Sequence, residues 1–283
     1  PSAAIIAYSW NMGSTGTFVN GTSSASANPS FVYNSCGIHN VELTATDANG
    51  CTHTITIPIQ VYCNPTANFS APAICFDDQP LQFNDTSIDG DGTVNTWIWN
   101  FGDPNNGTAA GQNPLYTFAD CGIYNVQLSV TDDNTCTDDI TIPVEIYCEP
   151  TAAFNYTPEC VGQNTVFADN SSSDITISSW QWDMGGTGTY QFGSSTSQNP
   201  VFLYDSCGTY NVQLIIVDDN GCNDTIIQPV DVYCEPIALF EADTVCQGDT
   251  TQFTNLSNQG PNPSAAIIAY SWNMGSTGTF VNG

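Results

Sequence analysis

The chain has 283 residues, no Lys or Arg and 28 acidic residues, so its formal charge is −28 at neutral pH. The chain therefore lacks the positively charged surface that binding to nucleic acids or to anionic membranes requires. Catalysis through a lysine Schiff base, or through Lys or Arg bound to a substrate phosphate, is also excluded. Hydrophobic residues form 41% of the chain, which is enough for packed cores, and no apolar run is long enough to span a membrane.

The sequence is repetitive on two scales. Residues 1–21 return unchanged at 263–283, which gives a period of 262 residues. A shorter phrase recurs as YCNPTANF, YCEPTAAF and YCEPIALF, with cysteines 85 and 86 residues apart. Units of this size suit small domains with one core. We therefore expect the later part of a type 1 domain at 1–64, domains at 65–149 and 150–235, and the beginning of another type 1 domain at 236–283.

Each unit carries a series of short strand signals, which we take in order for the middle unit. Apolar–polar alternation predicts strands at 67–70, 81–85, 96–101, 113–118, 123–130 and 140–146. Trp97, Trp99 and Phe101 should share one face, as should Tyr124, Val126, Leu128 and Val130. Asp132-Asp133-Asn134 should turn the chain, and Pro143 should mark a bulge or an edge strand. About seven short strands without a helical period favour an all-β sandwich.

Three motifs in these units resemble the PKD domain family. A Trp-Asp-Phe-Gly-Asp-like stretch begins at Trp10, Trp99 and Trp182. It is followed by an Asn-Pro stretch at Asn28, Asn113 and Asn199, and by a Gly-x-Tyr-x-Val-x-Leu-like stretch at 37–43, 122–128 and 208–214. Only Asp103 remains of the final Asp-Gly of the first motif. The resemblance covers the whole chain and implies tandem immunoglobulin-like sandwiches, as in large surface or adhesin proteins of Bacteroidetes-type bacteria.

The twelve cysteines keep one spacing of 15, 12 and 12 residues in three successive sets. Close Cys-x-x-Cys pairs are absent, so structural disulfides in an oxidising, extracellular setting are favoured over zinc. Four cysteines in a unit permit three pairings. The last two strands form a hairpin whose flanking cysteines lie at one end of the sheet. This geometry favours three bonds: Cys36–Cys63, Cys121–Cys148 and Cys207–Cys234.

The remaining cysteines are Cys51, Cys75, Cys136, Cys160, Cys222 and Cys246, to be paired within or between domains. Strand reversals place Cys75 and Cys136 at opposite ends of one sandwich, where they cannot meet. We therefore expect Cys75 to bond Cys222, and Cys160 to bond the counterpart of Cys51 in the next repeat. These bonds would staple the array into a rod.

The sequence shows no catalytic constellation, and we expect no enzyme activity. His39 stands where the other units have Tyr124 and Tyr210, which indicates packing, and His53 follows a turn cysteine. The tryptophan pairs Trp97/Trp99 and Trp180/Trp182 should pack in cores rather than form sugar-stacking platforms. No cofactor is implied.

Carboxylates cluster at Asp89/Asp91, Asp132/Asp133, Asp138/Asp139 and Asp218/Asp219. We expect them to be solvated turn residues. The alternative is a Ca²⁺ site, since Ca²⁺ prefers several oxygen ligands. Its candidate ligands are Asp89, Asp91 and Asp103.

Glycosylation is a further prediction. Asn-x-Ser/Thr sequons occur at Asn20, Asn68, Asn84, Asn106, Asn155, Asn170, Asn223 and Asn255. Short Asp-Thr motifs resembling bacterial O-glycosylation sites occur at Thr225, Thr244 and Thr250.

These features together predict a structural repeat of an extracellular filament, fibre or surface stalk. Its partners would be further copies of the repeat, with lateral bundling as an option. The alternative is an adhesin or binding module for glycan or Ca²⁺ at a cell surface.

Overall fold

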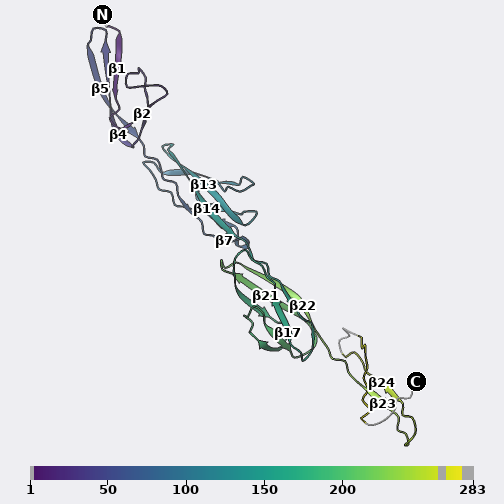
Figure 1. Ribbon diagram of the computed structural model, residues 1–283. Coiled ribbons are helices and arrows are strands. Elements are labelled where there is room, and N and C mark those ends of the chain that lie inside the picture. The colour runs from purple at the N-terminus through teal and green to yellow at the C-terminus, as the bar shows by residue number, and fades with distance from the viewer. Residues whose placement is uncertain (1–2, 261–265, 276–283) are drawn as a thin grey trace. The chain divides into compact units, whose positions relative to one another are not determined.

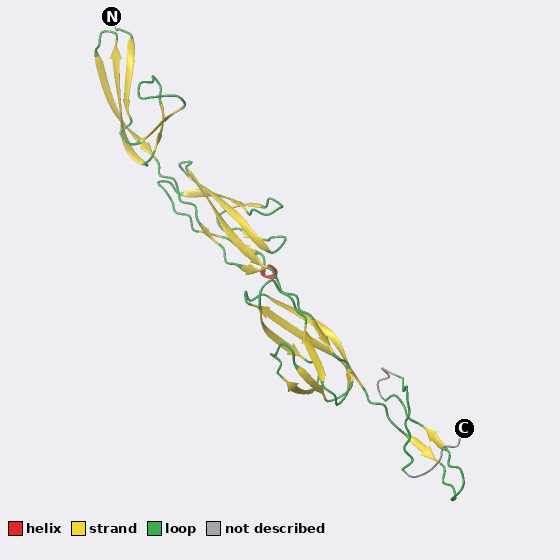
Figure 2. Ribbon diagram, in the orientation of Figure 1, coloured by secondary structure: helices red, strands yellow, loops and turns green. Residues whose placement is uncertain are grey.

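The chain is an all-β protein. The computed structural model describes residues 3–260 and 266–275, and within them the sole helical segment is the 3₁₀ turn η1, Phe76–Asp78 (Figure 2). The chain divides into two compact units, Pro1–Tyr147 and Cys148–Gly283, and each is described by itself. Residues 1–2, 263–265 and 276–283, which belong to the duplicated segments, lie outside the described residues.

The N-terminal part of the first unit has one long hairpin with a third strand beside it. β4 (Gly37–Asp47) pairs antiparallel with both β1 (Ile5–Asn11) and β5 (Thr52–Val61). A shorter hairpin joins β2 (Gly16–Val19) to β3 (Ser30–Tyr33) (Figure 1). The pairing of β1 with β4 and of β4 with β5 matches that of later strands in a sandwich, and the assignment of 1–64 to a type 1 domain stays a prediction.

The rest of the first unit is a complete sandwich. Its larger sheet has the order β11 (Thr108–Ala110), β10 (Val94–Asn100), β13 (Gly122–Asp132), β14 (Thr137–Tyr147) and β7 (Ile74–Cys75). The facing layer is built from two short pairs, β6 (Phe69–Ser70) with β9 (Asn84–Asp85), and β8 (Leu81–Gln82) with β12 (Leu115–Tyr116).

The second unit contains another complete sandwich, with two four-stranded sheets. One is β16 (Glu159–Cys160), β22 (Asn223–Tyr233), β21 (Gly208–Asp218) and β18 (Ile177–Asp183). The other is β15 (Phe154–Tyr156), β17 (Thr165–Asp169), β20 (Val201–Tyr204) and β19 (Gly188–Phe192). Beyond it, β23 (Phe240–Ala242) pairs with β24 (Phe253–Asn255).

Each sandwich encloses an aromatic core. In the first unit Trp99 lies between Phe69 and Phe83, with ring centroids 5.1 and 5.5 Å away. The predicted alternation of β13 is confirmed, because Val126, Leu128 and Val130 are buried, as is Tyr124. Trp182 and Val212 occupy the corresponding places in the second unit.

Two local predictions need refinement. The segment 81–85 is two strands rather than one, because the chain leaves β12 and joins β6 at Phe83, whose amide donates to Pro114 O. Pro143 marks an edge and not a bulge: it keeps regular register with Asn125, while β7 on its other side pairs only at 146–147. A proline lacks the N–H that a further strand would need.

Candidate functional site: an acidic turn at the Cys63 linker

An acidic loop and an acidic turn meet at one end of the first complete sandwich. Antiparallel pairing of β10 with β13 sets Val94 opposite Asp132, so the loop that precedes β10 meets the turn that follows β13. Asp133 N donates to Thr93 O, and Asp133 Oδ1 accepts from Thr93 N at 3.0 Å. The fold thus gathers Asp89, Asp91, Asp132 and Asp133 at this end.

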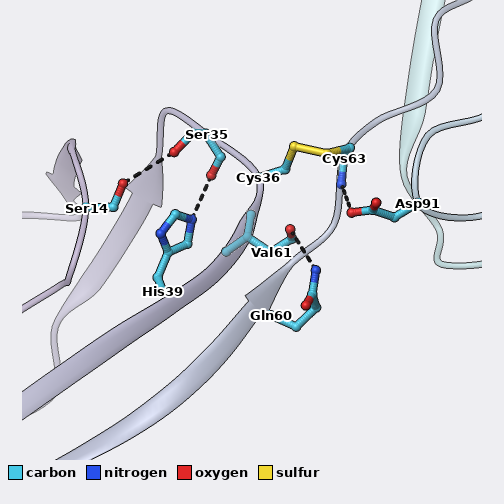
Figure 3. Close-up of a disulfide and its surroundings, with 8 residues drawn as sticks. All are labelled: Ser14, Ser35, Cys36, His39, Gln60, Val61, Cys63 and Asp91. Atoms are coloured by element: carbon cyan, nitrogen blue, oxygen red, sulfur yellow. Dashed lines mark hydrogen bonds between the residues drawn. A yellow bond between two sulfur atoms is a disulfide. The ribbon is translucent and has the colours of Figure 1, made fainter.

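Asp91 ties this loop to the linker that enters the sandwich. Its Oδ2 accepts a hydrogen bond from Cys63 N at 2.8 Å, and its own amide donates to Cys63 O at 3.3 Å. Figure 3 shows Asp91 on one side of Cys63 and the disulfide to Cys36 on the other. Gly90 is required here, because a Cβ at that position would collide with Cys63 O and Asn64 O.

Asp132 is the buried member of the cluster. It is only 2% exposed, and its Oδ1 accepts from Asn134 N and Cys136 N at 3.0 and 2.8 Å. Its Oδ2 has no hydrogen-bond partner within the part of the chain that the structure describes, and the same holds for Asp218 in the second unit. The expectation of solvated turn residues is therefore wrong for these two, because loops from elsewhere in the sequence cover them.

The acidic surroundings act on the neighbouring thiol. Burial, followed by the charges of Asp132 and Asp91, raises the pKa of Cys136 above its ordinary value. A raised pKa leaves less thiolate at a given pH, and the thiolate is the reactive form.

We therefore expect alkylation of Cys136 by iodoacetamide to become fast only at a higher pH than for an ordinary thiol. Asp132→Asn should shift its rate profile toward lower pH, because one of the charges that oppose ionisation is removed. Peptide mass spectrometry across a pH series measures this. An unchanged profile in the variant would contradict the electrostatic contribution.

Asp103, the third Ca²⁺ candidate, lies elsewhere. It follows the far end of β10, where Oδ1 accepts from Gly107 N and Oδ2 accepts from the Tyr116 hydroxyl at 2.8 Å. Burial, assisted by Asp103, raises the pKa of Tyr116 to about 12. The structure therefore brings Asp89 and Asp91 together but not Asp103, whose hydrogen bonds fix its own loop.

Two carboxylates that sequence reasoning missed bind the half-buried tryptophans that pack against the cores. Asp85 Oδ2 accepts from the Trp97 indole at 2.8 Å and from Gln112 Nε2 at 3.2 Å, while Ser87 N donates to Oδ1. Asp169 and Trp180 repeat the arrangement at 2.8 Å. Trp97 and Trp180 are half-buried, and a carboxylate binds the indole N–H of each. Neither ring is therefore a free platform on which a sugar could stack. In the sequence, the only sign of this arrangement is an Asp two residues after Phe83 and another two residues after Phe167.

This arrangement gives an acid dependence of stability. Burial alone would raise the pKa of Asp85, but hydrogen bonds from Ser87, Gln112 and Trp97 outweigh it and lower the pKa below the ordinary value. A folded-state pKa below the unfolded value stabilises the protein above the unfolded pKa of about 3.9, and this contribution is lost as pH falls through the folded value. We expect Asp85→Asn to flatten the loss of stability below about pH 4, as urea unfolding at several pH values would measure. An unchanged slope would contradict it.

Two of the three disulfides expected from the hairpin geometry are present. Disulfides join Cys36 to Cys63 and Cys207 to Cys234, each with Cα atoms 5.0 Å apart and a sequence separation of 27. Cys75, Cys121, Cys148 and Cys222 are also disulfide-bonded, and their pairing remains a prediction. Cys51, Cys136, Cys160 and Cys246 are free thiols.

The histidines have structural surroundings. His39 is buried, stacks on Tyr33 with ring centroids 4.5 Å apart, and places Nε2 2.9 Å from Ser35 O. Tyr124 binds Asp120 O four residues upstream in the same way. His53 is exposed on β5, away from His39. All the predicted glycosylation positions have exposed side chains, whether Asn or Thr.

The repeated geometry agrees with a family match along the sequence. PKD domain models match residues 1–58, 62–146 and 147–232, which together exceed half of the chain. The chain belongs to the PKD domain family. PKD domains are non-catalytic modules, and together with disulfides they are typical of extracellular proteins.

Similar proteins come from Vibrio. The pre-pro-metalloprotease PrtV of Vibrio cholerae is 31% identical over 145 residues, which are 50% of this chain and 15% of that protein. The chain thus spans about 15% of the length of the curated relatives it matches. The crystal structure of the PrtV PKD1 domain is 27% identical with a TM-score of 0.27, covering 30% of this chain and 98% of the other. The PKD1 domain of Vibrio anguillarum Epp is 28% identical with a TM-score of 0.27, covering 30% and 96%.

Among the described residues no helix is long and apolar enough to cross a membrane.

Proposed function

We propose that this PKD protein is the structural repeat of an extracellular filament, fibre or surface stalk. The observation that carries the proposal is the fixation of the Cys63 linker. Cys63 is covalently joined to Cys36 behind it and hydrogen-bonded through both backbone polar groups to the Asp91 loop ahead of it. A linker held on both sides transmits tension and resists bending, which a scaffold needs and a flexible tether does not.

The remaining sequence features support the same role. Pro65 follows the Cys63 linker, and Pro150 and Pro236 follow its two counterparts, so the backbone freedom of each linker is restricted. The absence of Lys and Arg removes trypsin sites, and the exposed sequons allow a glycan cover. The predicted Cys75–Cys222 bond belongs to this proposal and would add a covalent staple. Peptide mapping that joins Cys75 to Cys136 or to Cys121 instead would contradict it.

The native polymer tests the proposal directly. Its mass on a denaturing gel should stay in the megadalton range after reduction if the period of 262 residues continues within one chain. Electron microscopy of the isolated material should then show filaments with an axial repeat on the order of 100 Å, since strands of about ten residues at about 3.3 Å each give domains of roughly 35 Å. Soluble monomeric material without filaments would overturn the proposal.

A second candidate function is Ca²⁺ binding at the acidic turn. The observation that favours it is the buried Asp132 Oδ2, because a buried polar atom left without a partner is costly and a cation would relieve that cost. A Cβ placed on Gly92 would fall among Asp132, Asp133 and Asn134, so the glycine leaves a small polar space there. The donors are all oxygens or amide groups, which fit Ca²⁺.

Calorimetric titration of the full chain with CaCl₂ tests this candidate. Asp132→Asn should abolish binding at this turn. Asp218→Asn is the matched control, since Asp218 is equally buried but Ile175 stands at the position in the chain that corresponds to Gly92. Equal loss in both variants, or no binding by the unaltered protein, would rule out a specific site at Asp132.

A further inference from the structure

One sheet of the complete sandwich in the second unit carries an exposed apolar row on its outer face. In the sheet that contains β17 (Figure 1), Phe167 and Phe202 are buried, so the alternate residues of β17 and β20 face outward. The strand register sets Val166 opposite Val201 and Val201 opposite Phe192. Phe192 is 69% exposed and Val166 is 45% exposed. These three side chains, which we call the Phe192 row, therefore lie side by side at the surface.

The Phe192 row is a feature of this domain rather than of the fold. In the first complete sandwich Gln82 stands where Val166 stands here, since each directly precedes a core phenylalanine. The Gln82 amide donates to three nearby backbone carbonyls. It pairs with Leu115, which occupies the place of Val201. A polar amide thus interrupts the row in that sandwich, whereas the second sandwich keeps it apolar across three strands.

The face that carries the row is almost free of charge. The four described strands of its sheet, β15, β17, β20 and β19, contain one acidic residue, Asp169. Its carboxylate accepts from the Trp180 indole at 2.8 Å and from Gln198 Nε2 at 3.1 Å. In the opposite sheet, β22 alone contains two acidic residues. An apolar and uncharged face is therefore exposed on a chain whose formal charge is −28.

This charge distribution indicates which partner the row fits. The chain has no Lys or Arg that could pair with a carboxylate of another copy. Two copies therefore repel each other wherever their acidic faces approach. A partner with positive charge would be drawn to those acidic faces instead. The uncharged row is the surface on which two copies can meet at the lowest electrostatic cost.

We propose that the Phe192 row is a lateral contact between two copies of this chain, with the row of one copy packed on the row of the other. The inference deepens the scaffold role proposed above and rests on it, because it names a surface through which filaments bundle. A contact made by the same patch on both copies is isologous. Val201 lies in the middle of the row, so a two-fold axis near it sets Phe192 of each copy over Val166 of the other.

A single contact of this kind is weak, and repetition strengthens it. Four strands about 4.8 Å apart, with about five residues of about 3.3 Å each, give a face of roughly 300 Å². A standard stable interface buries about 800 Å² on each partner. In the proposed filament every period of 262 residues would carry one row, so that contacts between two long chains add up. Single chains should therefore pair only at high concentration, whereas filaments should bundle.

Sedimentation equilibrium of the full chain over a wide concentration range tests the contact. The protein is produced without glycans, since the predicted sequon at Asn155 lies on the same face, and it is kept in EDTA with free thiols blocked by N-ethylmaleimide without reduction. We expect a monomer–dimer equilibrium that strengthens between about 0.05 M and about 0.5 M NaCl, because salt screens the repulsion between two acidic chains.

Two variants on neighbouring strands remove the contact. Phe192→Asp should raise the dissociation constant at least about tenfold, as expected for an aromatic residue in the middle of an interface, and Val166→Asp should do the same. Ile227→Asp is the matched control, because Ile227 is 63% exposed on β22 of the same sandwich and receives the same charge. The control should leave the dissociation constant unchanged. Hydrogen-exchange protection of the β21 amides verifies that each variant is folded.

Three results would overturn the contact. The first is a chain that is monomeric at every concentration and salt, and the second is a dimer that both Phe192→Asp and Val166→Asp leave intact. The third is a dimer that forms only when CaCl₂ replaces EDTA, which would show that cations bridge acidic faces instead. Native chains of megadalton mass that form single, unbundled filaments would reject the lateral contact while leaving the proposed scaffold role intact.

Discussion

Trp99→Ala is expected to destabilise the first complete sandwich strongly while the stability of the second is unchanged. Trp99 is fully buried, its ring is surrounded by Phe69, Phe83 and Phe101, and its indole N–H donates to Gly111 O at 2.9 Å. Truncation of a buried tryptophan leaves a cavity and costs about 3–5 kcal/mol. Because small domains are stable by only about 5–15 kcal/mol, this loss is a large fraction of the total stability.

Hydrogen-exchange mass spectrometry resolves the effect by domain. Amides of β13 should lose protection in Trp99→Ala, whereas amides of β21 should keep it, because each sandwich has its own core. Trp182→Ala should produce the mirror result. Loss of protection in both sandwiches from either single substitution would show that the cores are not independent.

Removal of the Cys207–Cys234 disulfide should have the next largest effect. The bond closes a loop of 27 residues, and the loop-entropy relation gives about 3.5 kcal/mol for that length. The double variant Cys207→Ser/Cys234→Ser removes the constraint from the unfolded chain, so the free energy of unfolding of this domain should fall by about that amount. Urea unfolding measures the difference.

Cys160→Ser provides the control, because Cys160 is an exposed free thiol. Its effect on unfolding should stay within about 0.5 kcal/mol, as for other surface substitutions. If the double variant unfolds at the same urea concentration as the control, the disulfide does not stabilise the domain by restricting the unfolded chain.

The sequence was most informative about properties that depend on residues close together along the chain. Alternation along 123–130 decides which side chains of a strand face inward, and the burial of Val126 and Leu128 follows from that period. The pairing of Cys36 with Cys63 also follows from local geometry, since an antiparallel hairpin returns the chain to the end at which it began.

The sequence was least informative about the burial and the neighbours of the carboxylates. Asp132 and Asp133 are neighbours of the same type in one turn, yet Asp132 is buried and Asp133 is exposed. The difference arises from the loop at 89–93, which lies about forty residues earlier and covers one of them. Asp103 was grouped with Asp89 and Asp91 by composition, but the length of β10 separates them.

By itself, then, the sequence of this PKD protein determined the repeat, the hairpin of long strands at the end of each unit, and the Cys36–Cys63 and Cys207–Cys234 disulfides, because each depends on spacing along the chain. Only the tertiary structure decided that Asp91 holds the Cys63 linker, that Asp132 is buried, and that Asp85 and Asp169 bind indoles. Those properties depend on which distant segments cover a residue, and that is set by the packing of the sheets rather than by any local pattern.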